Sequence, residues 1–434
     1  MKKLIALLLA VLMVASVLVA CGGNNNNNAN NNNTDNGGKT TENSDPFYGE
    51  DNISLLVWAP DNAVSLTKQL CEDFIAKYPN KKITIDVQAQ GEADAAAQML
   101  NDLDKAADVF GFVCNSINKL QQGNALAPVI ADYLDDVKAR NTDFAVSTGT
   151  LTVDGKETLL AYPETGENGY YLVYDKQYVT DDDAQSLEGI LAACKKAGKK
   201  CLINIDNGFY GCMPLYTGGM VNNGLKEDGT QIFNDYNEDE VLDSLEAFAG
   251  LFHEYKDTFM SADPARIGSG MAENPSTVAA GVDGSWNAAT VAKTLGDNYG
   301  AAKLPTIKIK GEDKQIIGMN GAKLIGVNSR SKFPGAAQVL ANYLTSEEVQ
   351  TTRLEELNWL PSNKNAQQSD VVKNSPALSA LLAQSEFSIP QINIAETFWT
   401  PVGTLGAKLF KDDDYSRETL KKEFEKAVAN ILDE

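Results

Sequence analysis

The side chains that most often do chemistry in enzymes are scarce in this chain. His253 is the one histidine, and the cysteines beyond residue 21 are Cys71, Cys114, Cys194, Cys201 and Cys212. No C-x-x-C or H-E-x-x-H spacing typical of zinc sites occurs. A Ser-His-Asp or Cys-His arrangement would have to use His253. This histidine lies in a helical stretch, where we expect it to be an ordinary residue on the helix surface. We therefore expect no metal, no cofactor and no enzyme activity.

Cys21 carries chemistry of another kind. Lys2 and Lys3 precede an apolar run over residues 4–20, which ends in small Ala20 directly before Cys21. This pattern is typical of a lipoprotein export signal, whose removal leaves the cysteine as the lipidated first residue. A lone transmembrane helix is the alternative, but the run is short and no stop-transfer charges follow it. We predict a signal peptide over residues 1–20 and a lipid anchor on the extracellular face of the cytoplasmic membrane.

Two of the remaining cysteines are close enough in sequence to form a disulfide. Cys194 and Cys201 could close a short loop in an oxidising exterior. Five cysteines leave one unpaired, however, and an anaerobic source would keep all of them reduced. Both states stay open.

Residues 21–50 contain almost nothing that a core could bury. Asparagine dominates residues 24–33, followed by glycine, threonine, serine and acidic residues. Such a composition is typical of a disordered tether. A tether of this length would let a folded part move over the membrane surface and still reach a membrane partner.

The overall charge excludes one large class of partners. The chain has 37 Lys and Arg against 59 Asp and Glu, a formal net charge of −22. Binding to nucleic-acid phosphates is therefore not expected. The part from residue 51 to 434 is too long for one ordinary core and suits two lobes with a cleft between them.

The hydrophobic pattern predicts α/β units. Short β-branched or aromatic runs alternate with longer amphipathic segments. Strands are predicted over residues 53–58, 83–87 and 108–113, and helices over residues 63–78, 93–103 and 117–122. In the first helix, Leu66, Leu70, Phe74 and Ile75 fall on one face. These elements make one open-sheet lobe.

Three motifs carry a resemblance to a known family. They are WAPD at residues 58–61, YPETGENGYY at residues 162–171 and DGSW at residues 283–286. With the segments at 298–305, 317–328, 333–349, 387–399 and 417–431, they resemble the extracellular solute-binding proteins of sugar ABC importers, nearest to maltose and maltodextrin binders. The likeness runs in unbroken order from about residue 53 to 432.

The resemblance implies a fold. It is the type II periplasmic-binding-protein-like α/β fold, in which two discontinuous lobes are joined by hinge strands around a ligand cleft. The first lobe would comprise residues 51–164 and 319–370, and the second residues 165–318 and 371–434. The polar residues 164–168 would form a hinge crossing.

The resemblance also implies which side chains hold a sugar. A sugar ring stacks its C–H face on an aromatic ring, and amides or carboxylates bind its hydroxyls. Trp286 and Trp399 match the family's stacking tryptophans, although either could instead plug a lobe core. The other candidates implied are Asp61, Asn115, Glu167, Asn168, Tyr170, Asp206, Tyr210 and Trp359.

Some of these assignments stay open. Asp61 could serve only as a helix N-cap. A one-residue length difference leaves the choice between Glu167 and Asn168 undecided. Strand alternation is expected to bury either Tyr170 or Tyr171. Trp359 would only border the site.

One segment departs from the family pattern. Maltose binders carry a tryptophan and an acidic-basic pair after the third strand, where this chain has FVCNS at residues 112–116. Asn115 can still bond a hydroxyl, but the loss of the charged pair makes other oligosaccharides more plausible.

The sequence therefore predicts a monomeric receptor that captures malto-oligosaccharides, which are α-glucans, and delivers them to the permease of an ABC importer. A receptor for a non-starch oligosaccharide is the nearest alternative. A surface glycan-adhesion module and a glycoside hydrolase with paired carboxylates are alternatives of another class.

Overall fold

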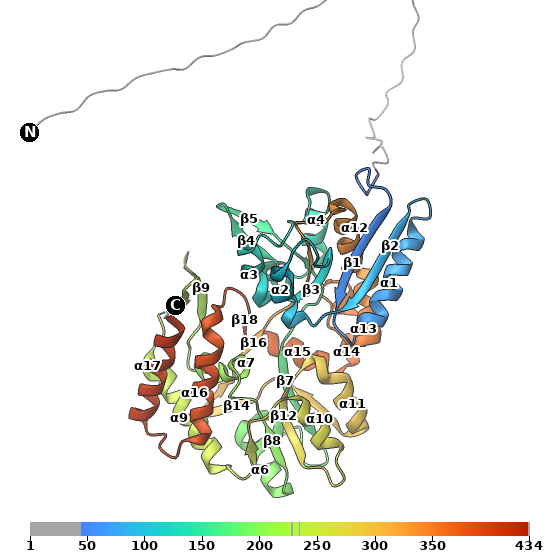
Figure 1. Ribbon diagram of the computed structural model, residues 1–434. Coiled ribbons are helices and arrows are strands. Elements are labelled where there is room, and N and C mark those ends of the chain that lie inside the picture. The colour runs from blue at the N-terminus through green and yellow to red at the C-terminus, as the bar shows by residue number, and fades with distance from the viewer. Residues whose placement is uncertain (1–44, 227–228, 234, 433–434) are drawn as a thin grey trace, which may run out of the picture. The chain divides into compact units, whose positions relative to one another are not determined.

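The computed structural model describes residues 45–226, 229–233 and 235–432 (Figure 1). This part contains two five-stranded sheets, each flanked by helices, so that it forms two α/β lobes. The predicted signal peptide, Cys21 and most of the predicted tether lie outside the described residues. Among the described residues, no helix has both the length and the apolar character needed to cross a bilayer.

The first lobe is built on a sheet with strand order β2-β1-β3-β17-β6. Strands β1, β2 and β3 are parallel, and β17 runs antiparallel to β3. All of β3 except its last residue is buried, as expected of a central strand covered on both faces. The bounds are β1 (Ile53–Ala59), β2 (Ile83–Ala89), β3 (Val109–Val113), β6 (Tyr162–Pro163) and β17 (Lys323–Val327).

Helices cover both faces of this sheet. In α1, the buried residues Thr67, Leu70, Cys71 and Phe74 recur with helical spacing and so form one stripe. The elements around the sheet are α1 (Val64–Lys77), α2 (Glu92–Asn101), α3 (Ile117–Gln122), α4 (Ala131–Arg140), α5 (Asp143–Thr148), β4 (Thr150–Val153), β5 (Lys156–Leu159), α12 (Pro334–Leu344) and α13 (Glu347–Leu357).

The second lobe has a sheet with strand order β11-β8-β12-β7-β13. All six residues of β7 are buried, because this strand lies between β12 and β13 and is covered on both faces. The expectation that alternation would bury only one of Tyr170 and Tyr171 is therefore wrong, because both are buried. The bounds are β7 (Tyr170–Asp175), β8 (Lys200–Leu202), β11 (Phe259–Met260), β12 (Val278–Gly284) and β13 (Tyr299–Ala302).

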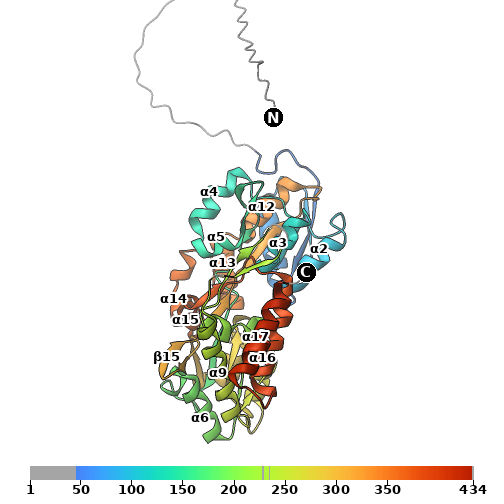
Figure 2. The same ribbon diagram turned by 90° about the vertical axis from the view of Figure 1, so that its left-hand side faces the viewer.

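Local signals set the ends of the second lobe's helices. In α6, the Ser186 hydroxyl accepts a hydrogen bond from Gly189 N at the start, and Gly198 ends the helix at φ 65°. The other elements are α7 (Gly208–Gly211), α8 (Met213–Thr217), α9 (Glu238–Glu254), α10 (Ala265–Ala272), α11 (Ala288–Leu295), α15 (Pro376–Ser385), α16 (Trp399–Lys411) and α17 (Arg417–Leu432), with α6 over Leu187–Ala197. Helices α9, α16 and α17 lie side by side (Figure 2).

Paired hairpins and a hinge complete the fold. The hairpins join β9 (Asn222–Leu225) to β10 (Gln231–Phe233), and β14 (Thr306–Ile309) to β15 (Glu312–Gln315). The chain passes between the sheets after β6, before β17, and after α13 through α14 (Asp370–Asn374). Here β16 (Gly318–Asn320) pairs in parallel with β18 (Ser388–Pro390). Two segments far apart in sequence therefore lie side by side where the chain passes between the lobes.

The end of the predicted tether belongs to the folded part. Phe47 is fully buried and packs edge-on against Phe74 and Tyr78. The Glu50 carboxylate accepts hydrogen bonds from Gly335 N and Ala336 N at the start of α12. The prediction of a disordered tether through residue 50 is therefore wrong for residues 45–50, because one aromatic side chain in a polar stretch suffices to anchor it.

Candidate ligand-binding cleft

A cavity of about 720 Å³ lies between the two lobes. Asn115 lines it from the first lobe, and most of the other lining residues belong to α7, α16 and the segments that precede them. From these, the residues with polar or aromatic side chains are Asp206, Asn207, Phe209, Gln391, Glu396, Trp399, Thr400, Thr404 and Lys411. We call this cavity the main cleft.

Asn115 reaches the main cleft because it follows the end of β3. It lies in a 3₁₀ turn, Cys114–Ser116, between β3 and α3. The buried Cys114 thiol holds this turn: it donates to the Gln391 carbonyl at 3.3 Å and accepts from Ala322 N at 3.3 Å. Asn115 itself is half-buried, and its amide can both donate to and accept from a ligand hydroxyl.

Trp399 faces the same cavity from the second lobe. It is the first residue of α16 and is half-buried, whereas its neighbour Phe398 is in the core. A side chain at Gly208 would come within 2.3 Å of the Trp399 carbonyl oxygen, so only glycine allows α7 to approach α16 this closely. This contact fixes the backbone that carries the Trp399 ring.

Trp286 extends the aromatic surface. Its side chain is 39% exposed, and its ring centroid lies 6.3 Å from that of Phe209, which lines the main cleft. The ring covers the backbone of Gly284, where a Cβ would meet it at 2.2 Å. Trp286, Phe209 and Trp399 therefore give the second lobe a set of aromatic surfaces for sugar rings.

Asp283 holds the turn that carries Trp286. Its Oδ1 accepts hydrogen bonds from Gly284 N at 2.7 Å and from Asn287 Nδ2 at 2.8 Å. Its Oδ2 is buried and has no partner among the described residues. Burial raises the pKa of Asp283 to about 7, although the two hydrogen bonds act in the opposite direction.

The two predicted tyrosines, Tyr170 and Tyr210, differ in whether their hydroxyl groups already have hydrogen-bond partners. Tyr170 is fully buried; its hydroxyl donates to the Phe209 carbonyl at 3.1 Å and accepts from Met319 N at 2.9 Å, so it packs the core. Tyr210 lies against it at 4.8 Å between ring centroids and is 3% exposed. The Tyr210 hydroxyl has no partner among the described residues.

Asp206 lines the main cleft, but protein groups already use its carboxylate. Ser261 Oγ donates to one oxygen, and Lys411 Nζ lies 3.1 Å from the other. Burial acts to raise the pKa of Asp206, but the hydrogen bonds from Ser261 and Lys411 outweigh it and hold that pKa below its usual value.

Glu167 and Asn168 lie at the hinge and are both buried. The Glu167 carboxylate accepts a hydrogen bond from Gly169 N at 2.8 Å, and Asn168 N donates to Asn320 Oδ1 at 3.1 Å. Burial raises the pKa of Glu167, while hydrogen bonds from Gly169 and Ser285 oppose the shift. The contact with Ser285 joins the hinge to the turn that carries Trp286.

Asp61 is exposed in the turn between β1 and α1. The N-cap position of α1 is Ala63, and no side chain caps that helix. The structure thus gives Asp61 no capping role and leaves its carboxylate open to solvent.

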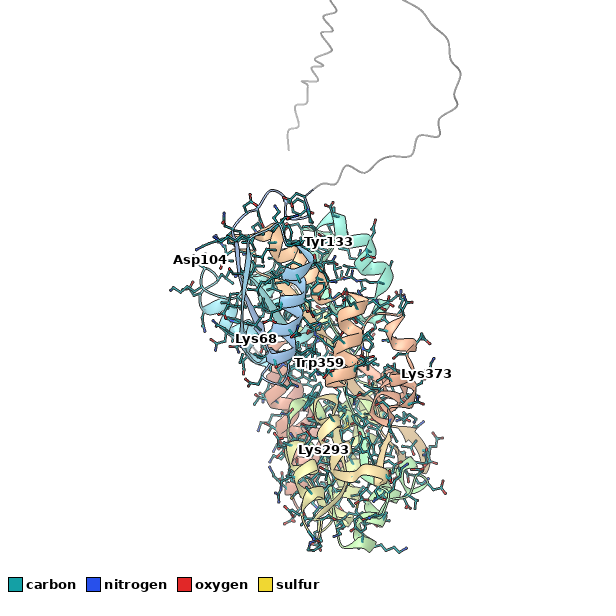
Figure 3. All side chains as sticks on the ribbon, turned by 90° about the vertical axis from the view of Figure 1, so that its right-hand side faces the viewer. Lys68, Asp104, Tyr133, Lys293, Trp359 and Lys373 are labelled. Atoms are coloured by element: carbon teal, nitrogen blue, oxygen red, sulfur yellow. The ribbon has the colours of Figure 1, made fainter. Side chains whose placement is uncertain are left out.

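Trp359 is 5% exposed and lies where the lobes meet (Figure 3). The Lys323 ammonium is 3.8 Å from its ring centroid and 2.8 Å from Glu92 Oε2. Nearby, Arg353 pairs with Glu164 at 3.0 Å, and all four charged side chains are buried. This cluster, Glu92, Glu164, Lys323, Arg353 and Trp359, is called the ionic base of the first lobe.

The cysteines and the histidine of the described part of the chain pack against other residues. All five cysteines there are free and buried, including Cys194 and Cys201. His253 stacks on Tyr415 at 4.3 Å. No group of three or more His, Cys, Asp or Glu side chains among the described residues could hold a metal ion.

The sequence pattern of bacterial extracellular solute-binding proteins matches residues 69–380, more than half of the chain. The chain belongs to this family. A structure solved with acarbose is 25% identical, with a TM-score of 0.77, covering 87% of this chain and 98% of that one. The maltodextrin-binding protein MalE1 from L. casei BL23, solved without ligand, is 25% identical with a TM-score of 0.75, covering 88% of this chain and 99% of that one.

A curated relative covers less of this solute-binding protein. It is the maltooligosaccharide ABC transporter solute-binding lipoprotein of Streptococcus pneumoniae serotype 4, which is 27% identical over 159 residues. The aligned part spans 34% of this chain and 37% of the relative. The structural neighbours confirm the predicted type II fold with two sheet-containing lobes.

The structure brings some of the predicted residues together. Asn115, Asp206 and Trp399 line the main cleft, and Trp286 joins them through Phe209. Tyr170, Glu167, Asn168 and Trp359 are buried within the protein.

Sequence reasoning did not select Phe209 or Glu396, which also line the main cleft. Phe209 adjoins Tyr210 in the same segment, so its aromatic character was a usable signal. Glu396 is exposed, and nothing in the segment 387–399 singles it out; only the path of residues 391–399 along the cavity reveals it.

Proposed function

We propose that this solute-binding protein captures malto-oligosaccharides in the main cleft and delivers them to the permease of an ABC importer. One observation carries the proposal: an amide from the first lobe, Asn115, and an aromatic ring from the second, Trp399, line the same cavity. A sugar between them would use both groups at once, with its C–H face on the ring and its hydroxyls on the amide.

The relatives support the choice of ligand. Two solved proteins that share the fold over nearly their whole length are a maltodextrin binder and a protein solved with acarbose. The curated relative is named for maltooligosaccharides and for an ABC transporter. No bond has to be made or broken for this role, so the protein acts as a receptor.

Ligand binding would favour the closed arrangement of the lobes. Because each lobe supplies only part of the contacts, a bound glycan stabilises the state in which both parts meet. The hinge, where β16 pairs with β18, is the place for such a movement. The closed state would then be the one that docks on the permease.

Calorimetric titration of the full-length protein in detergent tests the ligand class. The titrants are maltose, maltotriose, longer α-glucans, and xylo- and galacto-oligosaccharides. Micromolar affinity for α-glucans, about −8 kcal/mol, is the expected result. Binding only to another glycan would keep the receptor role and change the ligand, whereas no binding across the panel would refute the sugar assignment.

The lipid anchor is part of the same proposal. Cys21 follows an apolar export signal, and the Cys21→Ser variant should leave the membrane fraction for the soluble one. Retention of that variant in the membrane would contradict anchoring through Cys21.

A further inference from the structure

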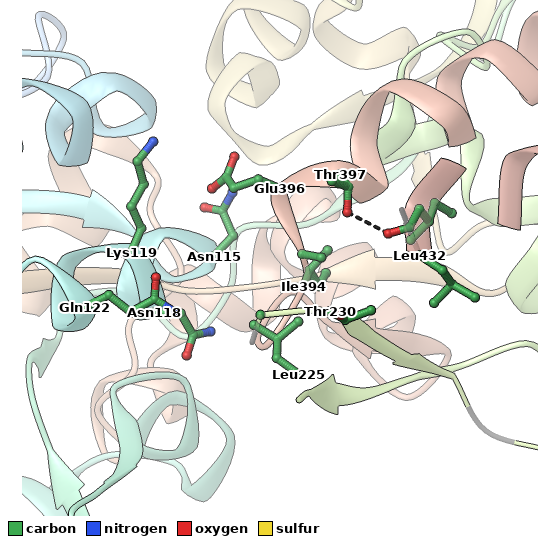
Figure 4. Close-up of a pocket in the computed structure, with 13 residues that line it drawn as sticks. Asn115, Asn118, Lys119, Gln122, Leu225, Thr230, Ile394, Glu396, Thr397 and Leu432 are labelled. Carbon is green, nitrogen blue, oxygen red and sulfur yellow. Dashed lines mark hydrogen bonds between the residues drawn. The ribbon is translucent and has the colours of Figure 1, made fainter. Parts of the chain in front are cut away.

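Most of the buried charged side chains among the described residues lie where the lobes meet. In the pocket beside the main cleft, by contrast, the charged side chains Lys119 and Glu396 are both exposed (Figure 4). Charges in water need no partner, whereas charges removed from water are costly unless opposite charges neutralise them. The balance of charge at the ionic base is therefore informative.

A third buried carboxylate lies next to the ionic base. Glu167 follows Glu164 by three residues in the hinge crossing, and both side chains are buried. The backbone ties this crossing to β17: Glu164 N donates to the Lys323 carbonyl at 2.9 Å, and Lys323 N donates to Thr165 Oγ1 at 2.9 Å. The Lys323 charge also acts on the Glu167 carboxylate. Glu167 therefore belongs to the same group of charges.

This group, the hinge charge cluster, consists of Glu92, Glu164, Glu167, Lys323 and Arg353. Lys323 pairs with Glu92 and Arg353 pairs with Glu164, so both cations are used. The Glu167 carboxylate has hydrogen bonds from the neutral groups of Gly169 and Ser285. Three carboxylates thus face two cations. If all five groups were ionised, one negative charge would stay buried without a counter-charge.

The titratable groups around the hinge charge cluster do not supply the missing positive charge. Cys71 of α1 and Tyr343 of α12 lie near Arg353, and burial raises the pKa of each to about 12. Tyr171 of β7 lies near Glu167, and burial raises its pKa well above the usual value. All three are neutral at physiological pH. A bound proton is the remaining way to balance the cluster.

Two oxygen atoms mark where such a proton would lie. Lys323 contacts Glu92 Oε2 and Arg353 contacts Glu164 Oε1. The other two oxygens, Glu92 Oε1 and Glu164 Oε2, are buried and have no hydrogen-bond partner among the described residues. A Cβ on Gly111 of β3 would lie 3.6 Å from the first and 3.8 Å from the second. Both oxygens therefore border the same space, which glycine leaves open.

We propose that the hinge charge cluster holds one proton, shared by Glu92 and Glu164 across the space at Gly111, and that this proton keeps the crossing between the lobes free of net charge. Two carboxyl groups that border one site cannot both ionise at low cost, so one of them keeps its proton to higher pH. In agreement, burial and the Glu92 charge raise the pKa of Glu164, although Arg353 and Lys323 act in the opposite direction.

Infrared spectroscopy of the full-length protein in detergent at neutral pH tests the proposal. A protonated carboxyl group has a carbonyl stretch well separated from the carboxylate bands. A heavy carbon isotope in the side-chain carboxyl group of glutamate shifts the glutamate bands and so distinguishes them from that of Asp283. The wild type should show a band for one protonated glutamate, and absence of that band would overturn the proposal.

Two conservative variants test whether charge balance holds the proton. Glu92→Gln and Glu167→Gln each leave two carboxylates with two cations, so the band should disappear in both although Glu164 remains. Glu355 is exposed on the same helix as Arg353, and Glu355→Gln should keep the band. If the band persists in both Glu92→Gln and Glu167→Gln, burial of one side chain alone holds the proton, and the shared site is overturned.

The pH dependence of stability gives a second measurement. The folded state would bind this proton more tightly than the unfolded chain does. Its contribution to stability is therefore complete below the ordinary pKa of glutamate, about 4.3, and is lost as the pH rises through the higher pKa of the folded state. The urea midpoint of the wild type should fall relative to that of Glu92→Gln as the pH rises. A difference in midpoint that does not vary with pH would overturn the proposal.

A measurement on the wild type alone covers the case in which the variants do not fold. The protonated-glutamate band should fade as the pH rises while far-ultraviolet circular dichroism shows that the protein stays folded. A band that disappears only when the protein unfolds would contradict a proton site that responds to pH. None of these measurements requires a glycan, so their outcome is independent of the proposed function.

Discussion

The two lobes contribute different kinds of side chain to the main cleft. The second lobe presents rings, with Trp399, Phe209 and Trp286 on or beside the cavity. The first lobe presents the Asn115 amide, and behind it lies the ionic base of the first lobe. Lys323 on β17 lies opposite Val113 on β3, and Val113 is two residues before Asn115. The charged side chains of the ionic base therefore lie at the same end of β3 as the Asn115 amide.

This difference indicates a division of roles. Aromatic rings supply much of the binding free energy because they bury large surfaces and lose little side-chain entropy. An amide on a rigid edge selects the positions of hydroxyl groups. Damage to the first lobe should therefore appear mainly as lost stability, and damage to the rings of the second lobe as lost affinity.

The largest effect is expected from breaking the ionic base. Arg353→Met would leave the Glu164 carboxylate buried without its cation, and burial already raises the pKa of Glu164. We expect a loss of about 3 to 5 kcal/mol in the free energy of unfolding, measured by urea denaturation. The double variant Arg353→Met, Glu164→Gln should recover part of the loss. Equal stability of the single and double variants would mean that the pair does not act as a unit.

The next effect concerns the aromatic wall of the second lobe. Trp399→Ala should reduce the affinity for malto-oligosaccharides by about 2 to 4 kcal/mol, because the ring lines the main cleft. Trp286→Ala should reduce it in the same direction. Tyr415→Ala, an exposed aromatic on the α16–α17 connection, is the control and should not change calorimetric affinity. An unchanged affinity in both tryptophan variants would contradict the proposed role of the rings.

A pH effect should distinguish the two lobes further. Because burial raises the pKa of Asp283 to about 7 in the folded protein, the folded state binds this proton more tightly than the unfolded chain does. Its contribution to stability is complete below about pH 4 and is lost as the pH rises through 7. Relative to Asp283→Asn, the wild type should therefore lose about 2 to 3 kcal/mol between pH 5 and pH 7.

Thermal or urea unfolding at several pH values measures this difference. The exposed Asp297 offers a control, since Asp297→Asn should follow the wild type at every pH. A stability difference between wild type and Asp283→Asn that does not vary with pH would show that Asp283 keeps its charge when folded.

The smallest effect is expected at the amide of the first lobe. Asn115→Ala should cost about 1 kcal/mol of affinity, the typical contribution of a hydrogen bond, with little change in stability because the side chain is half-buried at the cavity. Asn115→Asp should bind better than the alanine variant, since a carboxylate can still accept from a hydroxyl. A loss of affinity as large as that of Trp399→Ala would contradict the proposed division of roles between the lobes.

Much of the fold could be predicted from local patterns. The predicted strand over residues 53–58 and helix over residues 63–78 correspond to β1 (Ile53–Ala59) and α1 (Val64–Lys77). The helix over residues 117–122 has the same bounds as α3. These elements have clear periodicity and end signals, and both depend on residues close in sequence.

The candidate site was less accessible to such reasoning. Strand alternation suggested that one of Tyr170 and Tyr171 would be exposed, yet β7 is covered on both faces. Phe47 looked like part of a disordered tether, yet it is buried against α1. In both cases an element distant in sequence covers the side chain, so the local sequence pattern cannot predict that it is buried.

The sequence by itself determined the class of fold, the absence of common catalytic motifs, and the tryptophans worth testing, because these depend on residue type, spacing and order along the chain. Only the tertiary structure decided that Asn115 and Trp399 share a cavity and that Phe209 brings Trp286 beside it. The reason is physical: the main cleft forms where segments far apart in sequence meet, and its contacts depend on the packing of both lobes.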